Sequence, residues 1–210
     1  LVFFSNHNVE HERFKGWIER LDKLQKSGRL DKVQIFFSCD AFGPEGEYVR
    51  TGLDLQLALK NFEHILHKTN IEQGINSALT VTAVPGMPQM VDYINQCSKI
   101  KPIYWSMTKA ANRDDKNNPY LYPGIFGSKI NDWGLVEAID LFDVNTNGYP
   151  DTVKVNHKKF MQGNTIEFNS LLPDLVRMKQ LKIYLKELDR RRNTDYTKIF
   201  PQIHSELKNL

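Results

Sequence analysis

Hydrophobic and polar positions follow two different periods in the first half of the chain. Apolar residues spaced three and four apart predict amphipathic helices, and the short β-branched and aromatic runs between them predict strands. The expected strands are residues 2–4, 33–37, 75–84 and 102–106, and the expected helices are residues 10–25, 53–67 and 87–97. Because the two alternate strictly, we expect an α/β fold with a parallel sheet, either open and doubly wound or part of a barrel.

The pattern changes after residue 107. Polar, irregular segments are expected at residues 108–127 and 143–165, and helices at residues 132–142 and 171–192. The last helix is the longest helical signal, and Phe200 and Pro201 would close it off. We therefore expect residues 1–107 to form the strand–helix unit, and residues 108–210 to add a long loop and a C-terminal helical extension.

Composition narrows the class of protein. A chain of 210 residues, 40% of them hydrophobic, builds a core without a disulfide or metal staple. The net charge of +3 gives no reason to expect a nucleic acid, and no apolar run is long enough for a membrane span. Only two cysteines, Cys39 and Cys97, indicate a reducing, cytoplasmic location. Since the chain begins without Met inside an expected strand, we expect a fragment of a longer protein.

Polar residues stand where the expected strands end. Ligands of parallel α/β folds bind at the carboxyl ends of the strands, so this edge of the sheet is the expected rim of a site. The residues selected by this rule are Ser5-Asn6, Ser38-Cys39-Asp40, Thr82 and Ser106-Met107-Thr108. Residues 38–47, after the second strand, are expected to form a polar loop.

Arg50 follows this loop, twelve positions beyond Ser38. A hydroxyl, a carboxylate and a guanidinium on one rim suit a ribose and a carboxylate, because Arg pairs with carboxylates in a bidentate manner. The alternative is that Ser38 or Asp40 caps a helix, while Arg50 pairs on the surface with Glu45 or Glu47.

Three other motifs have simpler explanations. Residues 143–154 imitate an EF-hand loop, but Lys154 stands where a bidentate Glu is needed, so an Asn-Gly turn is favoured. His64 and His67 share a helical face without a third ligand in sight, so we expect no metal site there. The basic run at residues 190–192 suits the carboxyl end of a helix.

The segment after the second strand also carries a resemblance to a known family. Phe36-Phe-Ser-Cys-Asp-Ala-Phe-Gly, followed by Glu47-Tyr-Val-Arg-Thr-Gly, resembles the Ser-Ile-Asp-Gly … Glu-Tyr-Ile-Arg segment of radical S-adenosylmethionine (radical SAM) proteins. The group named for a twitch domain is the most similar, because residues 188–192 and 200–201 resemble its C-terminal signature. Weaker agreement is found at residues 3–6, 79–82 and 87–94, so the similarity runs from residue 1 to about residue 201.

The resemblance implies a TIM-like partial (β/α) barrel, truncated at its N-terminus, that binds S-adenosylmethionine and a [4Fe-4S] cluster. Such enzymes generate a 5′-deoxyadenosyl radical, which abstracts hydrogen from a substrate. The substrate would be a peptide, a protein or a small molecule, and the reductant a flavodoxin or ferredoxin. By resemblance, Ser38 faces the ribose, Arg50 faces the methionine carboxylate, and Asp40 orients that corner. The rest of this rim would be Ser5, Asn6 and Thr82.

The chain departs from the family at the cluster. The family holds it with Cys-x-x-x-Cys-x-x-Cys, and no such run occurs here, so ligands are expected upstream of Leu1. The chain alone is therefore not expected to be active, and no catalytic residue is identified. Two alternatives stay open: a non-catalytic binding or scaffolding module of the same ancestry, and a hydrolase or lyase that uses Asp40 and Glu47.

Overall fold

Four parallel strands form one sheet, in the spatial order β1-β2-β3-β4. This is a computed structural model that describes residues 1–109, 117–142 and 151–210. The strands are β1 Val2–Ser5, β2 Gln34–Ser38, β3 Glu72–Leu79 and β4 Ile103–Lys109. The predicted α/β class with a parallel sheet is confirmed. Strand order does not reverse among these strands, so they do not form the doubly wound arrangement.

Helices occupy every connection between the strands. The first group is α1 His11–Lys26, α2 Gly43–Val49, α3 Leu55–Lys68 and α4 Met87–Ser98, the last preceded by the 3-10 turn η1 Val84–Gly86. After β4 come η2 Pro119–Leu121, η3 Pro123–Trp133, α5 Leu135–Leu141, α6 Asp151–Asn169, α7 Leu175–Arg192, α8 Tyr196–Ile199 and α9 Pro201–Leu207. None of the helices in the described part of the chain could cross a membrane.

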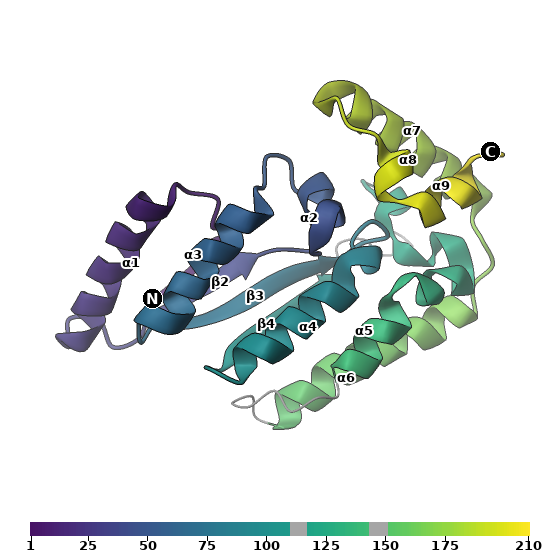
Figure 1. Ribbon diagram of the computed structural model, residues 1–210. Coiled ribbons are helices and arrows are strands. Elements are labelled where there is room, and N and C mark those ends of the chain that lie inside the picture. Colours follow the sequence, from purple (N-terminus) through teal and green to yellow (C-terminus); the bar gives the residue numbers. More distant parts are fainter. Residues whose placement is uncertain (110–116, 143–150) are drawn as a thin grey trace.

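Alternate strand residues give the sheet two different faces. One, the helix face, is covered by α1, α3 and α4, which lie along it in Figure 1. Most of its side chains are buried: Ile35, Phe37, Gln73, Ile75, Ser77, Leu79, Ile103 and Trp105. On the same face, Phe3 and Ser5 of β1 and Met107 of β4 keep part of their surface exposed. The other, the open face, keeps its side chains partly or fully exposed: Val2, Phe4, Gln34, Phe36, Ser38, Glu72, Asn76, Ala78, Tyr104 and Ser106.

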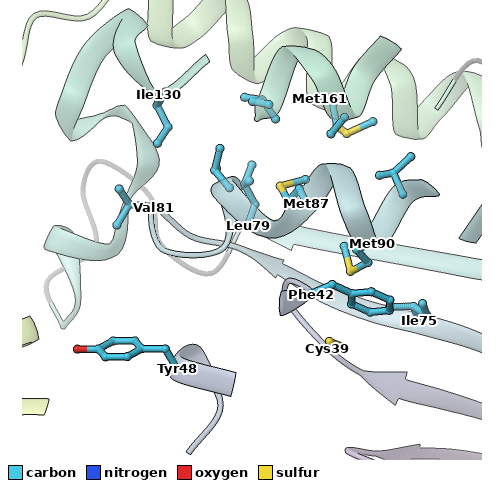
Figure 2. Packing of buried hydrophobic residues seen from close by; sticks show 14 of the residues in the cluster. Cys39, Phe42, Tyr48, Ile75, Leu79, Val81, Met87, Met90, Ile130 and Met161 are labelled. Carbon is cyan, nitrogen blue, oxygen red and sulfur yellow. The ribbon is translucent and has the colours of Figure 1, made fainter. Parts of the chain in front are cut away.

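The core continues from the helix face into the C-terminal half. Figure 2 shows Ile75 and Leu79 of β3 close to Met87 and Met90 of α4, with Met161 of α6 beyond them. The same cluster reaches α7 to α9, so the two halves of the chain share one core. A smaller cluster lies between α1, β2 and α3.

Three expectations about elements are wrong. The expected loop at residues 38–47 contains the start of α2, because Pro44 in its first turn is preorganised for a helix. The third strand begins at Glu72 and ends at Leu79, and the apolar residues that follow pack in the core as a turn. The segment 151–165, expected to be irregular, belongs to α6. The expected end of the long C-terminal helix at residue 192 is confirmed: α7 ends at Arg192, where Asn193 takes a left-handed φ of 53°, and it begins at Leu175, four residues later than expected.

Two expected segments lie partly outside the described residues. The parts not described are residues 110–116 of the expected long loop and residues 143–150 of the EF-hand-like segment. Within the described residues of the expected loop, β4 continues to Lys109, η2 begins at Pro119 and η3 begins at Pro123.

Candidate functional site

A row of polar side chains crosses the open face near the carboxyl ends of the strands. Ser38 of β2 is in register with Asn76 of β3, and Asn76 is in register with Ser106 of β4. Neighbours in register in a parallel sheet point to the same face, so the three side chains lie side by side. Each is partly exposed, and none makes a side-chain hydrogen bond with the described part of the chain. The row therefore presents free donors and acceptors to a ligand.

An aromatic row lies on the amino-terminal side of this polar row. The rings of Phe4 and Phe36 stack with centroids 5.2 Å apart, and Phe4 is 62% exposed. Gly74 continues the row between Phe36 and Tyr104, and a Cβ there would lie 2.7 Å from the Phe36 ring. The glycine therefore lets the ring lie flat across β3.

Asp40 and Arg50 meet at the carboxyl edge of the sheet. Arg50 Nη2 lies 2.9 Å from Asp40 Oδ1, which also accepts a 2.8 Å hydrogen bond from the Ala78 backbone N–H. Since β2 ends at Ser38, the Asp40 carboxylate takes the place of a strand carbonyl opposite Ala78. One oxygen thus fixes both β3 and the guanidinium.

The guanidinium keeps capacity for a second partner. Arginine has five N–H donors in a planar fork, and among the described residues Arg50 makes one side-chain hydrogen bond, to Asp40. Its Nε is buried and has no hydrogen-bond partner among the described residues, while the side chain as a whole is 31% exposed. Such a group suits a carboxylate or another planar anion.

Two glycines bring the Asp40 loop against its neighbours. A Cβ on Gly46 would lie 2.1 Å from the Ala41 carbonyl oxygen, and a Cβ on Gly86 would lie 2.4 Å from the Phe42 carbonyl oxygen. Phe42 N donates to Gly86 O across 3.2 Å. Helix α2 and turn η1 are therefore packed directly on the backbone of residues 41–42, and only glycine fits at either contact.

The other rim residues predicted from the sequence are occupied locally. Ser5 Oγ accepts from His7 N, and Asn6 Oδ1 accepts from Asn8 N, so both side chains stabilise the turn after β1. Thr82 is not on the sheet, because β3 has already ended at Leu79. Its side chain is 5% exposed, and its hydroxyl is hydrogen-bonded to that of Thr80. The structure thus brings Asp40 and Arg50 together, with Ser38 on the adjoining open face, and does not bring Thr82 to the open row.

The alternative predictions for this segment, a helix cap by Ser38 or Asp40 and a surface ion pair of Arg50, are wrong. Arg50 pairs with Asp40 and not with Glu45 or Glu47. Glu47 instead accepts from the Leu55 backbone N–H at the start of α3. The residue before α2 is Phe42, which makes no side-chain cap, so neither Ser38 nor Asp40 serves as one.

Neither cysteine is suited to bind metal. Cys39 is fully buried and Cys97 is 4% exposed. Burial raises the pKa of the Cys39 thiol to about 12 and that of Cys97 to about 11, so both stay protonated at neutral pH. Within the described ranges, no three His, Cys, Asp or Glu side chains are grouped as metal ligands.

Asn76 is the site residue that the sequence interpretation missed. Its signal is the alternation within Ile75-Asn-Ser-Ala-Leu79, in which the odd-numbered positions face the core. Because the third strand was expected to extend to residue 84, Thr82 and not Asn76 was predicted to lie at its carboxyl end.

Comparison with known proteins adds no relative. The sequence matches no protein-family model, no curated protein and no solved structure. What the site can do must therefore be inferred from its own geometry.

Proposed function

We propose that the chain is the S-adenosylmethionine-binding part of a radical SAM protein. The observation that carries the proposal is the Asp40–Arg50 pair beside the open polar row, at the carboxyl edge of a sheet wound in one direction. These are the residues that the family resemblance assigns to the amino-acid and ribose ends of that ligand.

The residues present fit the two polar ends of S-adenosylmethionine. The free donors of Arg50 would take the methionine carboxylate, and Asp40 would hold the guanidinium in place. The Ser38 hydroxyl, with Asn76 beside it, offers donors and acceptors to ribose hydroxyls. Arg50 lies at the carboxyl edge of the sheet, and Ser38 and Asn76 lie on the adjoining open face. One extended ligand could therefore contact all three.

A partial (β/α) barrel is the architecture we propose for this sheet. In such barrels the strands follow in sequential order, helices lie outside, and the other sheet face lines the interior. The described strands have that order and the one-sided helix layer, while the open face carries the polar row. The barrel interior would then be this open face.

The iron–sulfur cluster does not fit the residues of this chain. When bound, S-adenosylmethionine and a [4Fe-4S] cluster that has received one electron from a reductant would together supply a 5′-deoxyadenosyl radical, and thiolates must hold the cluster. Cys39 and Cys97 are buried and protonated, so we assign this chain the binding of the ligand and no cleavage step. We propose a cytoplasmic peptide- or protein-modifying role only for a longer protein that also contains the cysteine ligands of the cluster. The same condition applies to a flavodoxin or ferredoxin as its reductant.

The hydrolase alternative has less support. Asp40 is bound to Arg50 and Ala78, and Glu47 caps α3, so neither carboxylate is poised as a general base. A non-catalytic binding module of the same ancestry is the remaining rival. Such a module would have the same S-adenosylmethionine site as the enzyme, but it would hold no iron–sulfur cluster.

Calorimetric titration with S-adenosylmethionine tests the proposal. We expect Arg50→Ala to weaken binding about 10- to 100-fold, because a charge-assisted hydrogen bond to a carboxylate contributes about 1.5–3 kcal/mol. Arg13→Ala is the matched control, since Arg13 lies over the Trp17 ring on α1, away from the site. Wild-type protein that binds no S-adenosylmethionine, or Arg50→Ala that binds it unchanged, would contradict the proposal.

Anaerobic reconstitution with iron and sulfide separates the catalytic protein from its rival. We expect this chain to remain colourless, because both thiols are buried. Protein from the parent gene that turns brown and cleaves S-adenosylmethionine would support the enzyme, and protein that binds the ligand but no cluster would support the binding module.

A further inference from the structure

The carboxyl end of α7 contacts α2 directly beside the candidate site. The Tyr48 hydroxyl donates to Asp189 Oδ1 across 3.0 Å, and Arg192 Nη1 donates to the Tyr48 carbonyl oxygen across 2.6 Å. Tyr48 stands two residues before Arg50, while its two partners are 141 and 144 residues further along the chain. We call Asp189 and Arg192 the α7 clamp.

Asp189 connects three segments through one carboxylate. Besides Tyr48, its Oδ1 accepts from Thr194 Oγ1 at 2.8 Å, and its Oδ2 accepts from Tyr196 N at 2.9 Å. These bonds fix the turn from α7 to α8. The position of Tyr48 is therefore tied to a turn that is itself closed by hydrogen bonds.

Arg192 satisfies a carbonyl that α2 leaves open. The last carbonyl groups of a helix have no N–H partner within it, and Tyr48 is in the last turn of α2. The Arg192 guanidinium supplies that partner, and its Cζ lies 5.8 Å from the centre of the Tyr48 ring. One arginine thus holds both the backbone and the ring.

The Tyr48 ring is held on its remaining side by the C-terminal helices. It is 4% exposed and meets Phe200 edge-on with centroids 5.1 Å apart. In Figure 2 it points away from the part of the core around Cys39 and Ile75. Burial, and then the neighbouring Asp189 carboxylate, raise the pKa of Tyr48 above its ordinary value of 10.0, so the phenol remains a hydrogen-bond donor.

We propose that Asp189 and Arg192 are positioning residues for Arg50. Helix α2 is held against the Asp40 loop on one side, because Gly46 packs directly on the Ala41 carbonyl oxygen. Holding Tyr48 from the other side therefore fixes α2, and with it the backbone from which the Arg50 guanidinium reaches Asp40. The inference rests on the proposed function, since the group positioned is the one assigned to the ligand carboxylate.

Two ligands that differ at the carboxylate report on this positioning. S-adenosylhomocysteine and 5′-methylthioadenosine share the adenosyl thioether, and only the first has the amino-acid end. Their affinity ratio therefore measures the contribution of the whole amino-acid end, which includes the carboxylate assigned to Arg50. We expect Arg192→Ala to lower this ratio about 10-fold and Arg192→Lys to restore part of it, because a lysine keeps one charged donor. Arg190→Ala is the matched control, since Arg190 pairs with Glu187 on the exposed side of the same run.

Amide hydrogen exchange measures the clamp without a ligand. In Arg192→Ala we expect exchange at residues 48–51 to rise at least about 10-fold while the middle of α3 is unchanged. If Arg192→Ala does not fold, Tyr48→Phe removes the hydroxyl contact and keeps the ring on Phe200. Tyr48→Phe should lower the affinity ratio of the two ligands and raise the exchange at residues 48–51, both by a smaller factor than Arg192→Ala.

The outcomes separate the two proposals. A wild-type preference for S-adenosylhomocysteine that Arg192→Ala loses and Arg190→Ala keeps would support the positioning role. Equal weakening of both ligands, or a lower melting temperature with an unchanged ratio, would overturn it. If the wild-type protein binds neither ligand, the proposed function fails, and unchanged exchange in Arg192→Ala would then overturn the clamp as well.

Discussion

The two faces of the sheet use alternate residues of the same strands, and they differ in almost every property. On the helix face, Phe37 and Ile75 are fully buried. On the open face, their chain neighbours Phe36, Ser38 and Asn76 are partly exposed, and the last two have unbonded side chains within the described structure. The packing of the fold and the candidate ligand contacts are therefore encoded by different residues of one segment.

Separation of this kind has a physical cause. Successive side chains of a strand point to opposite sides, so a one-sided helix layer removes every second residue from water and leaves the others accessible. Mutations at odd and even positions of β3 should then affect different measurements. Three pairs of substitutions test this difference, and a fold that depended equally on both faces would not show it.

The largest expected effect is on the helix face. Phe37→Ala should lower the free energy of unfolding by about 3–5 kcal/mol, because it removes a fully buried ring and leaves a cavity. Phe36→Ala is the matched substitution on the open face, and we expect a loss of about 1 kcal/mol from its stacking on Phe4. Urea unfolding of the two variants measures both values. Similar losses would contradict the division between the faces.

This division was predictable from the sequence for the central helices and strands. Periodicity placed α1, α3 and α4 within two residues of their ends, because their apolar stripes face the sheet. The prediction of the third strand failed at its end, because residues can be buried without extended backbone. Val81 and Val84 belong to the core, yet they follow the end of β3. Hydrophobicity in that run reports burial and not extended backbone.

The candidate site was predictable only in part, for a similar reason. Asp40 and Arg50 follow a strand whose end was placed to within one residue, so their position could be inferred from the chain. Helix α2 could not, since its Gly-Pro start is typical of a loop and its stability comes from partners such as Asp189, far away in sequence. Tertiary contacts of this kind leave no local pattern.

The second substitution concerns a polar residue buried beneath the helix face. His7 is 0% exposed, and its ring lies 5.0 Å from that of Phe37, with both ring nitrogens unpaired among the described residues. Burial lowers the pKa of His7 from 6.5 to about 3. Between these values the unfolded chain binds a proton that the folded chain does not, so stability falls as the pH falls below 6.5 and is unaffected well above it.

We expect this histidine to cost about 2 kcal/mol of stability between pH 7 and pH 5, at about 1.4 kcal/mol per pH unit. His7→Leu should remove that part of the pH dependence, and His67→Gln, at an exposed position of α3, should leave it unchanged. Urea unfolding at the two pH values measures the difference. A His7→Leu variant with the wild-type slope would show that His7 is protonated in the folded protein.

The smallest expected effect on stability is on the open face, where function should change most. Asn76→Ala removes a side chain without hydrogen bonds to the described residues, so the free energy of unfolding should change by less than about 0.5 kcal/mol. If Asn76 bonds the ligand, affinity for S-adenosylmethionine should fall about 3- to 10-fold, as the loss of one neutral hydrogen bond predicts.

Ser77, the next residue of β3, provides the opposite case. It is 2% exposed on the helix face, and its Oγ accepts from Trp105 Nε1 at 3.0 Å. Ser77→Ala should therefore lower stability by about 1 kcal/mol and leave the affinity unchanged. Unfolding and calorimetry on this pair make the sharpest comparison, because the two positions are adjacent and differ in which face they occupy. If both variants lose affinity together, or Asn76→Ala loses stability instead, the open face is a structural surface and the ligand binds elsewhere.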